Sequence, residues 1–472
     1  MWLINLEASP KCRPMIGMRS ILVTGGTVIT MDARRRLIPN GAVYIEDGVV
    51  ADVGRAAALK KSRGPDVEIR ATDHAILPGF VDSHVHMTHS LIRGLCHGLT
   101  LKDCLTGIIW PAQAAIGGDE ALAASELCML EMLTSGTTTF VEAGLHTRFG
   151  LDRIAESVQR IGLRGILSKT IMDSPASSTN VGALDPAMVE DAEECFRETS
   201  SLLKKWSAPG SRVGIWLAPR ALGAVSRELF REVACFSKEK GTGITMHLME
   251  SEADVGFTKK FYGATPVQFA KEAGLLGPRT LLAHMLGSDE RDAAALSASG
   301  TSVAHCPSSS MTLASGYCPV PMLLRAGVKV SLGCDGASHN FSYDMFNEMR
   351  LASILHKARQ LDPTALPAAS VLELATTGGA EAVGLRCTGS IEVGKAADII
   401  TVDLKRSHTT PAPDAASALV YSSTESDVDN VIVGGSLLLE GGRVLTCDVG
   451  RVLRAGSDAA ARVLERSGLR RA

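Results

Sequence analysis

Several histidines and one aspartate follow short apolar runs in the chain, and these residue types bind divalent metal ions. His84 and His86 lie two residues apart, so in an extended strand both imidazoles point to the same face and can reach one ion. His247 and His284 end further apolar runs, and Asp335 closely follows another. Four or five nitrogen and oxygen ligands, with no thiolate among them, suit Zn²⁺ or Fe²⁺ with one position open for water.

The spacing of these residues favours a shared site. Alone, a His-x-His pair is weak evidence, a single histidine more often packs in a core, and an aspartate before glycine can simply cap a turn. Here 37 residues separate His247 from His284 and 51 separate His284 from Asp335, which fits one and two strand–helix units respectively. We therefore predict that these five residues meet at one metal site.

A carboxylate, Glu250, lies three residues after His247 and has two interpretations. In the first turn of a helix it would be a solvated acid that the helix dipole favours. At the mouth of a metal site it would move a proton to a ring nitrogen or a leaving amine, which contributes ~10²–10⁴ in rate. His305 also ends an apolar run and is expected to face the site. Among the remaining histidines, His89, His97 and His339 are further candidates, His146, like His97, is equally compatible with an ordinary structural role, and His74, His356 and His408 are expected to be structural.

These candidates require a scaffold that brings distant strand ends together. Residues 76–385 alternate short apolar runs with helical patterns, which favours an α/β fold, a (β/α)8 TIM-type barrel with its active site at the C-terminal ends of the strands. The predicted strands are Ile76–Val81, Thr138–Glu142, Gly165–Lys169, Val213–Leu217, Ile244–His247, Thr280–His284, Ser302–His305 and Val328–Leu332. The alternative, a doubly wound open sheet, would need a glycine-rich loop leading into a helix, and Gly25-Gly26 is not followed by one.

The two ends of the chain carry short β-like runs separated by turns. Asp47-Gly48 between two apolar runs is a strong hairpin signal, and similar runs return between Ala397 and Leu445. We therefore predict a small β-sandwich domain built from residues 19–75 and 386–450, interrupted by the catalytic barrel of residues 76–385. Residues 1–18 are expected to be a poorly ordered extension, with the true start at Met1, Met15 or Met18, and residues 451–472 a C-terminal surface helix.

Composition narrows the function classes. The chain has 472 residues, a formal net charge of -3, 45% hydrophobic and 21% charged residues, which excludes wholesale disorder. The near-neutral balance gives no electrostatic footprint for nucleic acid or an acidic membrane surface. The 11 cysteines are odd in number and contain no C-x-x-C pair, so we expect reduced, mostly buried thiols and a cytoplasmic location.

The strand-end motifs resemble those of the amidohydrolase superfamily. The matching segments are Pro78–His86, His247–Glu250, Leu282–His284, His305–Ser309, Asp335–Ser338 and Ile391–Asp398. The pattern is most similar to the branch of methylthioadenosine/S-adenosylhomocysteine deaminases, 8-oxoguanine and pterin deaminases and s-triazine hydrolases. This resemblance implies one divalent metal ion, zinc or alternatively iron, on His84, His86, His247 and Asp335. It also implies that His284 binds or orients the metal's water, and that Glu250 handles the substrate proton.

Two positions depart from the nucleoside deaminases of this branch. Those enzymes carry a Glu-Trp pair on the helix after the first strand, whereas this chain has Asp103-Cys104 upstream of a retained Trp110. They place a histidine after the Ala-Pro of the fourth strand, whereas Arg220 stands here. We therefore take Asp103, Trp110, Arg220 and His305 as candidate substrate-binding residues, and we expect the substrate not to be plain adenosine.

The predicted function is hydrolytic deamination of an amino-substituted N-heteroaromatic ring, such as a purine, a nucleoside or a pterin, with release of ammonia. Glu250, His284 and Asp335 are the expected catalytic residues. One alternative is a triazine hydrolase that displaces halide or alkylamine, and another is a catalytically inactive assembly protein of the same fold. The expected partner is a small heterocyclic substrate, without nucleic acid or membrane, and the resemblance implies a homo-oligomer.

Overall fold

An eight-stranded parallel sheet forms the centre of the structure, a computed structural model that describes residues 20–62, 64–174, 185, 188–208 and 210–469. Its strands follow each other in chain order. They are β8 (Phe80–Val85), β9 (Thr137–Leu145), β10 (Arg164–Ile171), β11 (Val213–Pro219), β12 (Ile244–Leu248), β13 (Thr280–His284), β14 (Ser302–His305) and β15 (Lys329–Leu332). A parallel bridge between Val85 and Asp335 joins the last strand region to the first. The sheet is therefore a closed (β/α)8 barrel, and the predicted fold class is confirmed.

Helices cover the outside of the barrel, as buried parallel strands require. They are α4 (Gly118–Thr134), α5 (Leu151–Ile161), α6 (Ala192–Trp206), α7 (Arg227–Lys240), α8 (Glu252–Tyr262), α9 (Pro266–Glu272), α10 (Glu290–Ser299), α12 (Val320–Arg325), α14 (Met345–Gln360), α15 (Ala368–Ala375) and α16 (Thr377–Ala382). Shorter elements follow the strand ends: η1 (Met87–Ile92), α2 (Leu101–Cys104), η2 (Leu105–Ile109), α3 (Trp110–Ala115), η3 (Thr147–Phe149), α11 (Pro307–Thr312) and α13 (Ala337–Asn340).

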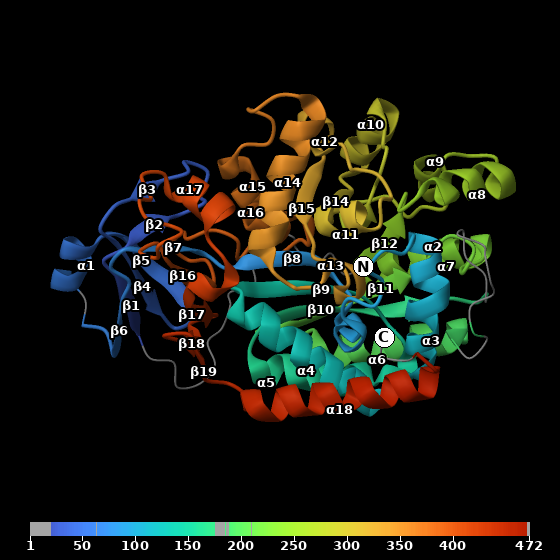
Figure 1. The fold of residues 1–472 in the computed structure, drawn as a ribbon, viewed down its shortest axis with the longest axis horizontal. Coiled ribbons are helices and arrows are strands. Elements are labelled where there is room, and N and C mark those ends of the chain that lie inside the picture. The colour runs from blue at the N-terminus through green and yellow to red at the C-terminus, as the bar shows by residue number, and fades with distance from the viewer. Residues whose placement is uncertain (1–19, 63, 175–184, 186–187, 209, 470–472) are drawn as a thin grey trace.

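Strands from both chain ends form two further sheets, seen side by side in blue and red at the left of Figure 1. The four-stranded sheet has the order β5 (Val49–Arg55), β4 (Gly41–Glu46), β1 (Ile21–Thr24), β6 (Val67–Arg70). The seven-stranded sheet has the order β19 (Arg443–Val444), β18 (Ser436–Glu440), β17 (Val428–Val433), β16 (Ile399–Asp403), β7 (His74–Pro78), β2 (Thr27–Ile29), β3 (Leu37–Ile38). One buried cluster contains Val43 of the first sheet and Ile76 and Ile399 of the second, so the two sheets share a core.

The hairpin signal in the sequence is confirmed. Asp47 and Gly48 join β4 to β5, and both have positive φ values, 50° and 78°. A two-residue turn with both residues in the left-handed region matches the twist of paired strands, which is why Asp-Gly is favoured there.

One predicted strand is corrected. The apolar run Ile76–Val81 was expected to be the first barrel strand, but Gly79 divides it between β7 of the seven-stranded sheet and β8 of the barrel. A Cβ at Gly79 would lie only 2.1 Å from Thr138 Cγ2, so the close approach of β9 requires glycine at this junction. The other seven predicted barrel strands overlap β9–β15. The domain limits given above remain a proposal, and residues 1–18 lie outside the described part of the chain.

The remaining helices lie at the edges of these layers. They are α1 (Ala56–Ser62), α17 (Ala415–Ser417), η5 (Ala418–Ser422), η6 (Glu425–Asp427) and α18 (Val449–Ser467). Helix α18, red in Figure 1, runs along α4 and buries Val452, Ala459 and Val463. In the described ranges, no helix is long and apolar enough to cross a membrane.

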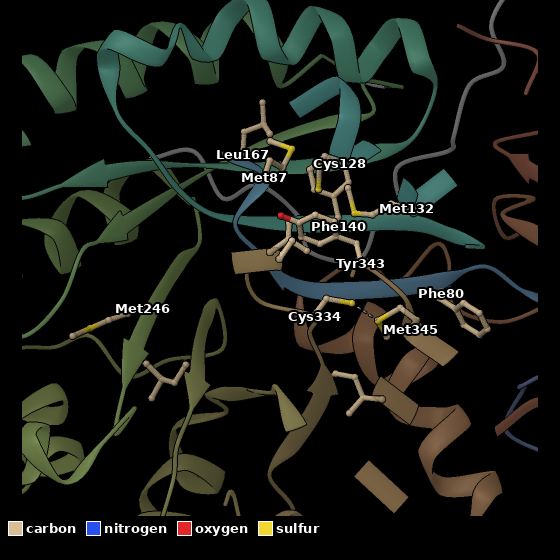
Figure 2. Close-up of a cluster of buried hydrophobic side chains, with 14 of the residues drawn as sticks. Phe80, Met87, Cys128, Met132, Phe140, Leu167, Met246, Cys334, Tyr343 and Met345 are labelled. Atoms are coloured by element: carbon tan, nitrogen blue, oxygen red, sulfur yellow. Dashed lines mark hydrogen bonds between the residues drawn. The ribbon is translucent and has the colours of Figure 1, made fainter. Parts of the chain in front are cut away.

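Large side chains fill the space between the barrel and its helices. Figure 2 shows Cys128, Met132, Phe140 and Tyr343 together in this core. The Tyr343 hydroxyl donates a hydrogen bond to the His86 carbonyl oxygen at 2.6 Å, and Cys334, whose Sγ lies 3.8 Å from Met345 Sδ, directly precedes Asp335. The packed core therefore holds the backbone beside two of the predicted metal ligands.

A buried ion pair joins the barrel to the seven-stranded sheet. Arg164, the first residue of β10, donates from Nε to Asp398 Oδ2 at 2.6 Å and from Nη2 to Asp398 Oδ1 at 3.0 Å. Asp398 also accepts hydrogen bonds from the Gly434 amide and the Thr388 hydroxyl. Burial by itself raises the pKa of Asp398, but the Arg164 guanidinium outweighs it and the pKa is lowered.

We expect Arg164→Met to lower the free energy of unfolding by about 3–5 kcal/mol, because it leaves the Asp398 carboxylate buried without its cation. Urea denaturation followed by circular dichroism measures the change. The matched control is Arg153→Met, since Arg153 and Asp119 form an exposed pair and its loss should cost at most ~1 kcal/mol. Equal effects of the two substitutions would contradict a role for Arg164 in holding the sheets together.

Candidate metal centre and active site

Five buried side chains converge at the C-terminal ends of the barrel strands. His84 lies near the end of β8 with His86 just beyond the strand, His247 and His284 lie at or next to the ends of β12 and β13, and Asp335 follows β15. His86 Nε2 lies 3.0 Å from His247 Nε2 and 3.5 Å from Asp335 Oδ1, and His84 Nε2 lies 3.6 Å from the same oxygen. The structure thus brings together the five residues that the strand-end pattern selected.

The protonation of these groups fits a divalent metal ion. Burial lowers the pKa of His86 and His247 well below the ordinary value and that of His284 to about 3, so their rings are neutral and offer lone pairs. Burial raises the pKa of Asp335, but the adjacent His339 and His84 outweigh it and hold the pKa well below its ordinary range. Neutral imidazoles and one carboxylate are a donor set for Zn²⁺ or Fe²⁺.

Unpaired polar atoms point to the same conclusion. In the part of the chain that the structure describes, both ring nitrogens of His84 and Nε2 of His284 are buried without a hydrogen-bond partner. Buried polar atoms without partners cost free energy, and a bound ion satisfies them. The observed donor set therefore fits a metal ion better than a purely structural cluster.

The two carboxylate oxygens of Asp335 have different environments. Oδ2 accepts a hydrogen bond from Ser309 Oγ at 2.6 Å and lies 3.2 Å from His339 Nε2. Oδ1 is left facing His84 and His86. Because Ser309 and His339 fix one oxygen, the carboxylate presents the other to the imidazoles, as outer partners do for metal ligands.

Backbone geometry around the cluster is strained. His284 and Asp335 have φ values of 74° and 66°, in the left-handed region that residues with a Cβ rarely adopt. Such conformations cost about 1–3 kcal/mol each and concentrate at functional sites. The surrounding hydrogen bonds maintain Asp335 there, since its amide donates to the His84 carbonyl oxygen at 2.7 Å and its own carbonyl oxygen accepts from the His86 amide at 3.1 Å.

Glu250 lies between β12 and α8 at the rim of the cluster. Its side chain is 22% exposed, and Oε1 lies 3.9 Å from His284 Nε2. Burial, together with the nearby carboxylates of Asp335 and Asp254, raises the pKa of Glu250 to about 8. At neutral pH the carboxyl group therefore carries a proton that it can donate. Helix α8 begins only at Glu252, so Glu250 precedes the helix.

The candidate substrate-binding residues have different surroundings. Arg220, half-buried after β11, donates from Nη2 to Gln113 Oε1 at 3.3 Å, and the charges of Glu250, Asp335 and Glu142 act on it. Trp110 is buried at the start of α3. His305 is buried in β14 with its ring against that of His356, with 5.4 Å between the ring centroids.

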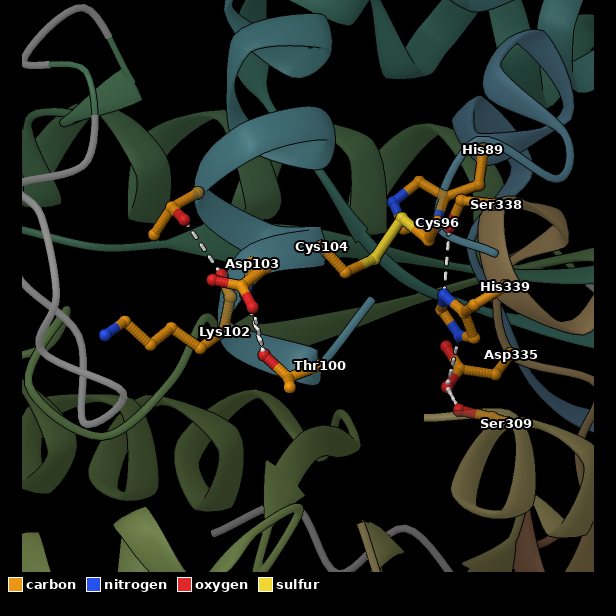
Figure 3. The surroundings of a disulfide bond; sticks show 11 residues. His89, Cys96, Thr100, Lys102, Asp103, Cys104, Ser309, Asp335, Ser338 and His339 are labelled. Carbon is orange, nitrogen blue, oxygen red and sulfur yellow. Dashed lines mark hydrogen bonds and ion pairs between the residues drawn. A yellow bond between two sulfur atoms is a disulfide. The ribbon is translucent and has the colours of Figure 1, made fainter. Parts of the chain in front are cut away.

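Asp103 is exposed on α2. Its carboxylate accepts a hydrogen bond from the Thr100 hydroxyl at 2.8 Å, and that hydroxyl accepts from the Asp103 amide (Figure 3). This reciprocal pair caps the N-terminus of α2. The structure thus assigns the side chain a local role and does not bring it to the cluster.

Sequence reasoning missed two polar residues near the site. Glu142, in β9, accepts hydrogen bonds from the Met87 amide at 2.7 Å and the Gly144 amide at 3.2 Å, and burial raises its pKa to about 8. It ends the predicted strand Thr138–Glu142, and a carboxylate at a strand end was the signal available. Gln113, the partner of Arg220, had no such signal, because it lies on a helix.

The expectation of uniformly reduced thiols is wrong for one pair. Cys96 and Cys104 form a disulfide, and none of the other eight cysteines in the described ranges forms one. The segment after η1 folds back so that the Cys96 amide donates to the Ser338 carbonyl oxygen, and α2 places Cys104 against it (Figure 3). A spacing of eight residues carries no sequence signature of this fold-back.

Comparison with known proteins places this geometry in a family. Residues 75–438 match the amidohydrolase family. The 5'-deoxyadenosine deaminase of Methanosarcina barkeri is 36% identical over 95% of this chain and 99% of its own. The 5-methylthioadenosine/S-adenosylhomocysteine deaminase of Pelotomaculum thermopropionicum is 34% identical over 95% of this chain and 100% of its own. The zinc-bound crystal structure of an adenosine deaminase from Xanthomonas campestris, 31% identical, superposes with a TM-score of 0.88 over 94% of this chain and 98% of that one. The predicted resemblance is confirmed: this chain is a hydrolase acting on C–N bonds, and it belongs to the amidohydrolase family.

Proposed function

We propose that this enzyme is a metal-dependent deaminase of adenine nucleosides altered at the 5' position, releasing ammonia from the purine ring. The observation that carries the proposal is the position of the Glu250 carboxyl group, whose Oε1 lies 3.9 Å from His284 Nε2 at the rim of a buried His/Asp cluster. The relatives named above support the substrate class, since they are deaminases of 5'-deoxyadenosine and of methylthioadenosine or S-adenosylhomocysteine. They do not favour the s-triazine alternative.

We assign the metal to His84, His86, His247 and Asp335, with zinc as the proposed ion and iron as the alternative. A divalent ion held by these residues would lower the pKa of water and so supply a nucleophile at neutral pH. His86 and His247 remain neutral, and Asp335 remains ionised, as this role requires. Retention of the whole donor set argues against an inactive assembly protein.

The remaining groups move protons. We assign to Glu250 Oε1 the donation of its proton to the purine ring nitrogen. The resulting carboxylate takes the second proton of the added water and passes it to the departing amine, which leaves as ammonia. The first water proton, accepted by His284 and Asp335, then restores the protonated carboxyl of Glu250. His284 Nε2, neutral and without a partner among the described residues, can accept a proton from the attacking water together with Asp335. Ser309 and His339 hold Asp335 Oδ2, so the carboxylate keeps its orientation while the proton moves.

We assign substrate contacts to Arg220, Trp110, His305 and Asp103. Support is strongest for Arg220, a half-buried guanidinium whose one hydrogen-bonded side-chain partner among the described residues is the neutral Gln113. A planar cation without a carboxylate against it suits an anionic tail or an electron-rich carbonyl of the substrate. Support is weakest for Asp103, which caps α2. We also propose a homo-oligomer in the cytoplasm, on the family resemblance and the mostly unpaired cysteines.

His84→Ala, His247→Ala and Asp335→Ala are each expected to reduce bound metal to well below one ion per chain, because each removes a ligand from a small set. Elemental analysis of the purified variants measures the metal, and circular dichroism checks the fold. His408→Ala is the matched control, because His408 pairs with Asp427 outside the cluster. Full metal content and undiminished turnover in any of the three variants would refute its assignment.

Glu250→Gln should retain metal and lower kcat by roughly 10²–10⁴, because glutamine keeps the shape but carries no transferable proton. The wild-type kcat should also fall as the pH rises through about 8, where Glu250 loses its proton. Steady-state kinetics across pH 6–10, with elemental analysis of both proteins, tests this role. Loss of metal from the glutamine variant would instead make Glu250 a ligand or a structural partner.

Ammonia release should be fastest with a 5'-altered adenine nucleoside, in a screen that also contains adenosine, guanine, 8-oxoguanine, pterins and triazines. Arg220→Ala should raise KM for the best substrate by ~10–100-fold, the cost of losing a charged hydrogen bond. Arg227→Ala, which removes an exposed guanidinium paired with Glu272, is the control. An unchanged KM in the Arg220 variant, or a kcat/KM for unmodified adenosine of ~10⁵ M⁻¹s⁻¹ or above, would contradict the proposed specificity.

A further inference from the structure

The Cys96–Cys104 disulfide lies just beneath the surface beside the active site. Both cysteines are buried, at 1% and 0% exposure, whereas His97, Thr100 and Lys102 between them are exposed. A small opening of this short segment would therefore expose the sulfurs to a soluble thiol.

One end of the disulfide is attached to the loop that carries Asp335. The Gly94 and Cys96 amides donate to the carbonyl oxygens of Ala337 and Ser338, both at 3.0 Å. A ring nitrogen of His339 lies within 4.8 Å of both sulfurs, and His339 Nε2 lies 3.2 Å from Asp335 Oδ2. In Figure 3, His339 lies between the disulfide and Asp335.

The other end is attached to the helices that carry the proposed substrate contacts. Cys104 ends α2, and the chain continues through η2 into α3, where Trp110 is buried and Gln113 accepts from Arg220. In the described structure, the hydrogen bonds made by residues 97–109 run to residues of the same stretch, 94–113. The disulfide thus ties Cys104, in the stretch called here the 97–109 segment, to Cys96, whose amide is hydrogen-bonded to the Asp335 loop.

We propose that Cys96 and Cys104 are a reversible oxidation site that controls substrate binding, a proposal that rests on the function proposed above. In the disulfide form, the 97–109 segment is fixed against the Asp335 loop, and the proposed substrate contacts on α3 are in place before substrate binds. In the dithiol form the segment is released, and only a fraction of the molecules has these contacts in place. The metal ligands are unaffected, because the barrel strands and their ends hold them.

The redox step balances with a low-molecular-weight dithiol as the reductant. A thiolate of the reductant attacks one Sγ, the Cys96–Cys104 bond breaks, and the other Sγ leaves as a thiolate that takes up a proton. The second thiol of the reductant then resolves the mixed disulfide. The two cysteines gain two electrons and two protons, and the reductant becomes a cyclic disulfide.

The same three residues are not assigned to a second metal ion. Two cysteine sulfurs and one imidazole are a known ligand set for zinc. In this structure, however, the sulfurs are bonded to each other, and the two nitrogens of His339 already face Ser338 at 2.9 Å and Asp335 at 3.2 Å. Binding of zinc by Cys96, Cys104 and His339 after reduction would overturn the proposal.

The test uses the full-length holoenzyme, oxidised and then titrated with dithiothreitol. The oxidised protein should show two fewer thiols, after denaturation, than its 11 cysteines, and a non-reduced peptide map should contain Cys96 linked to Cys104. Reduction should raise KM roughly 5–20-fold at unchanged kcat and metal content, because apparent affinity falls with the fraction of binding-competent conformer. Reoxidation by a low-molecular-weight disulfide, the reverse of the exchange above, should restore the original KM.

Two variants and one physical measurement make the result specific. Cys104→Ala should have the raised KM both with and without dithiothreitol. Cys235→Ala, which removes an exposed cysteine outside the disulfide, should respond to dithiothreitol like the wild type. Hydrogen–deuterium exchange of residues 97–109 should increase on reduction in the wild type and not in Cys104→Ala. This readout needs no substrate, so it still tests the disulfide if no deaminase activity is found.

Three results would overturn the proposal. They are absence of the Cys96–Cys104 peptide from the oxidised protein, a KM and exchange rate that do not change on reduction, and uptake of a further zinc ion by the reduced wild type but not by Cys104→Ala.

Discussion

Closing an eight-stranded barrel requires the last strand to meet the first, and here that closure runs through the metal-ligand residues. The Asp335 amide bonds to the His84 carbonyl oxygen, and the His86 amide bonds to the Asp335 carbonyl oxygen. The same contacts that complete the barrel therefore set the separation of three of the four proposed ligands. The barrel closure and the metal-ligand cluster therefore cannot be altered independently. Loss of the backbone pairing between Asp335 and the His84–His86 segment would disturb the positions of the metal ligands more than those of the distant helices.

The closure depends on close backbone approach and on local strain. A Cβ at Gly333 would lie 2.7 Å from His84 Cβ, and one at Gly336 would lie 2.0 Å from His89 Nδ1. Asp335, between these glycines, has a left-handed conformation with φ 66°. Tyr343 supports the opposite strand through its bond to the His86 carbonyl oxygen. The packed core thus maintains a backbone that would otherwise relax, which is typical of sites preorganised for chemistry.

Sequence patterns predicted the elements and residues that depend on local periodicity. They missed the contacts that form only when distant or folded-back parts of the chain meet. The positions of His84, His247 and His284 followed from apolar runs of strand length, and the Asp47-Gly48 turn from its dipeptide. The Arg164–Asp398 pair, whose members are 234 positions apart in the chain, could not be seen, because only the completed barrel brings the two together. The Cys96–Cys104 disulfide was missed for a different reason, since a separation of eight residues carries no sequence signature of the fold-back that joins them.

The site separates two carboxyl groups into different protonation states, and this separation assigns their roles. Both are buried, and burial alone would neutralise both. His339 and His84 keep Asp335 ionised, whereas Glu250 faces the like charges of Asp335 and Asp254 and keeps its proton up to about pH 8. Arg220 opposes that shift without reversing it. One carboxylate is therefore available as a metal ligand and the other carboxyl as an acid, because their charged neighbours differ.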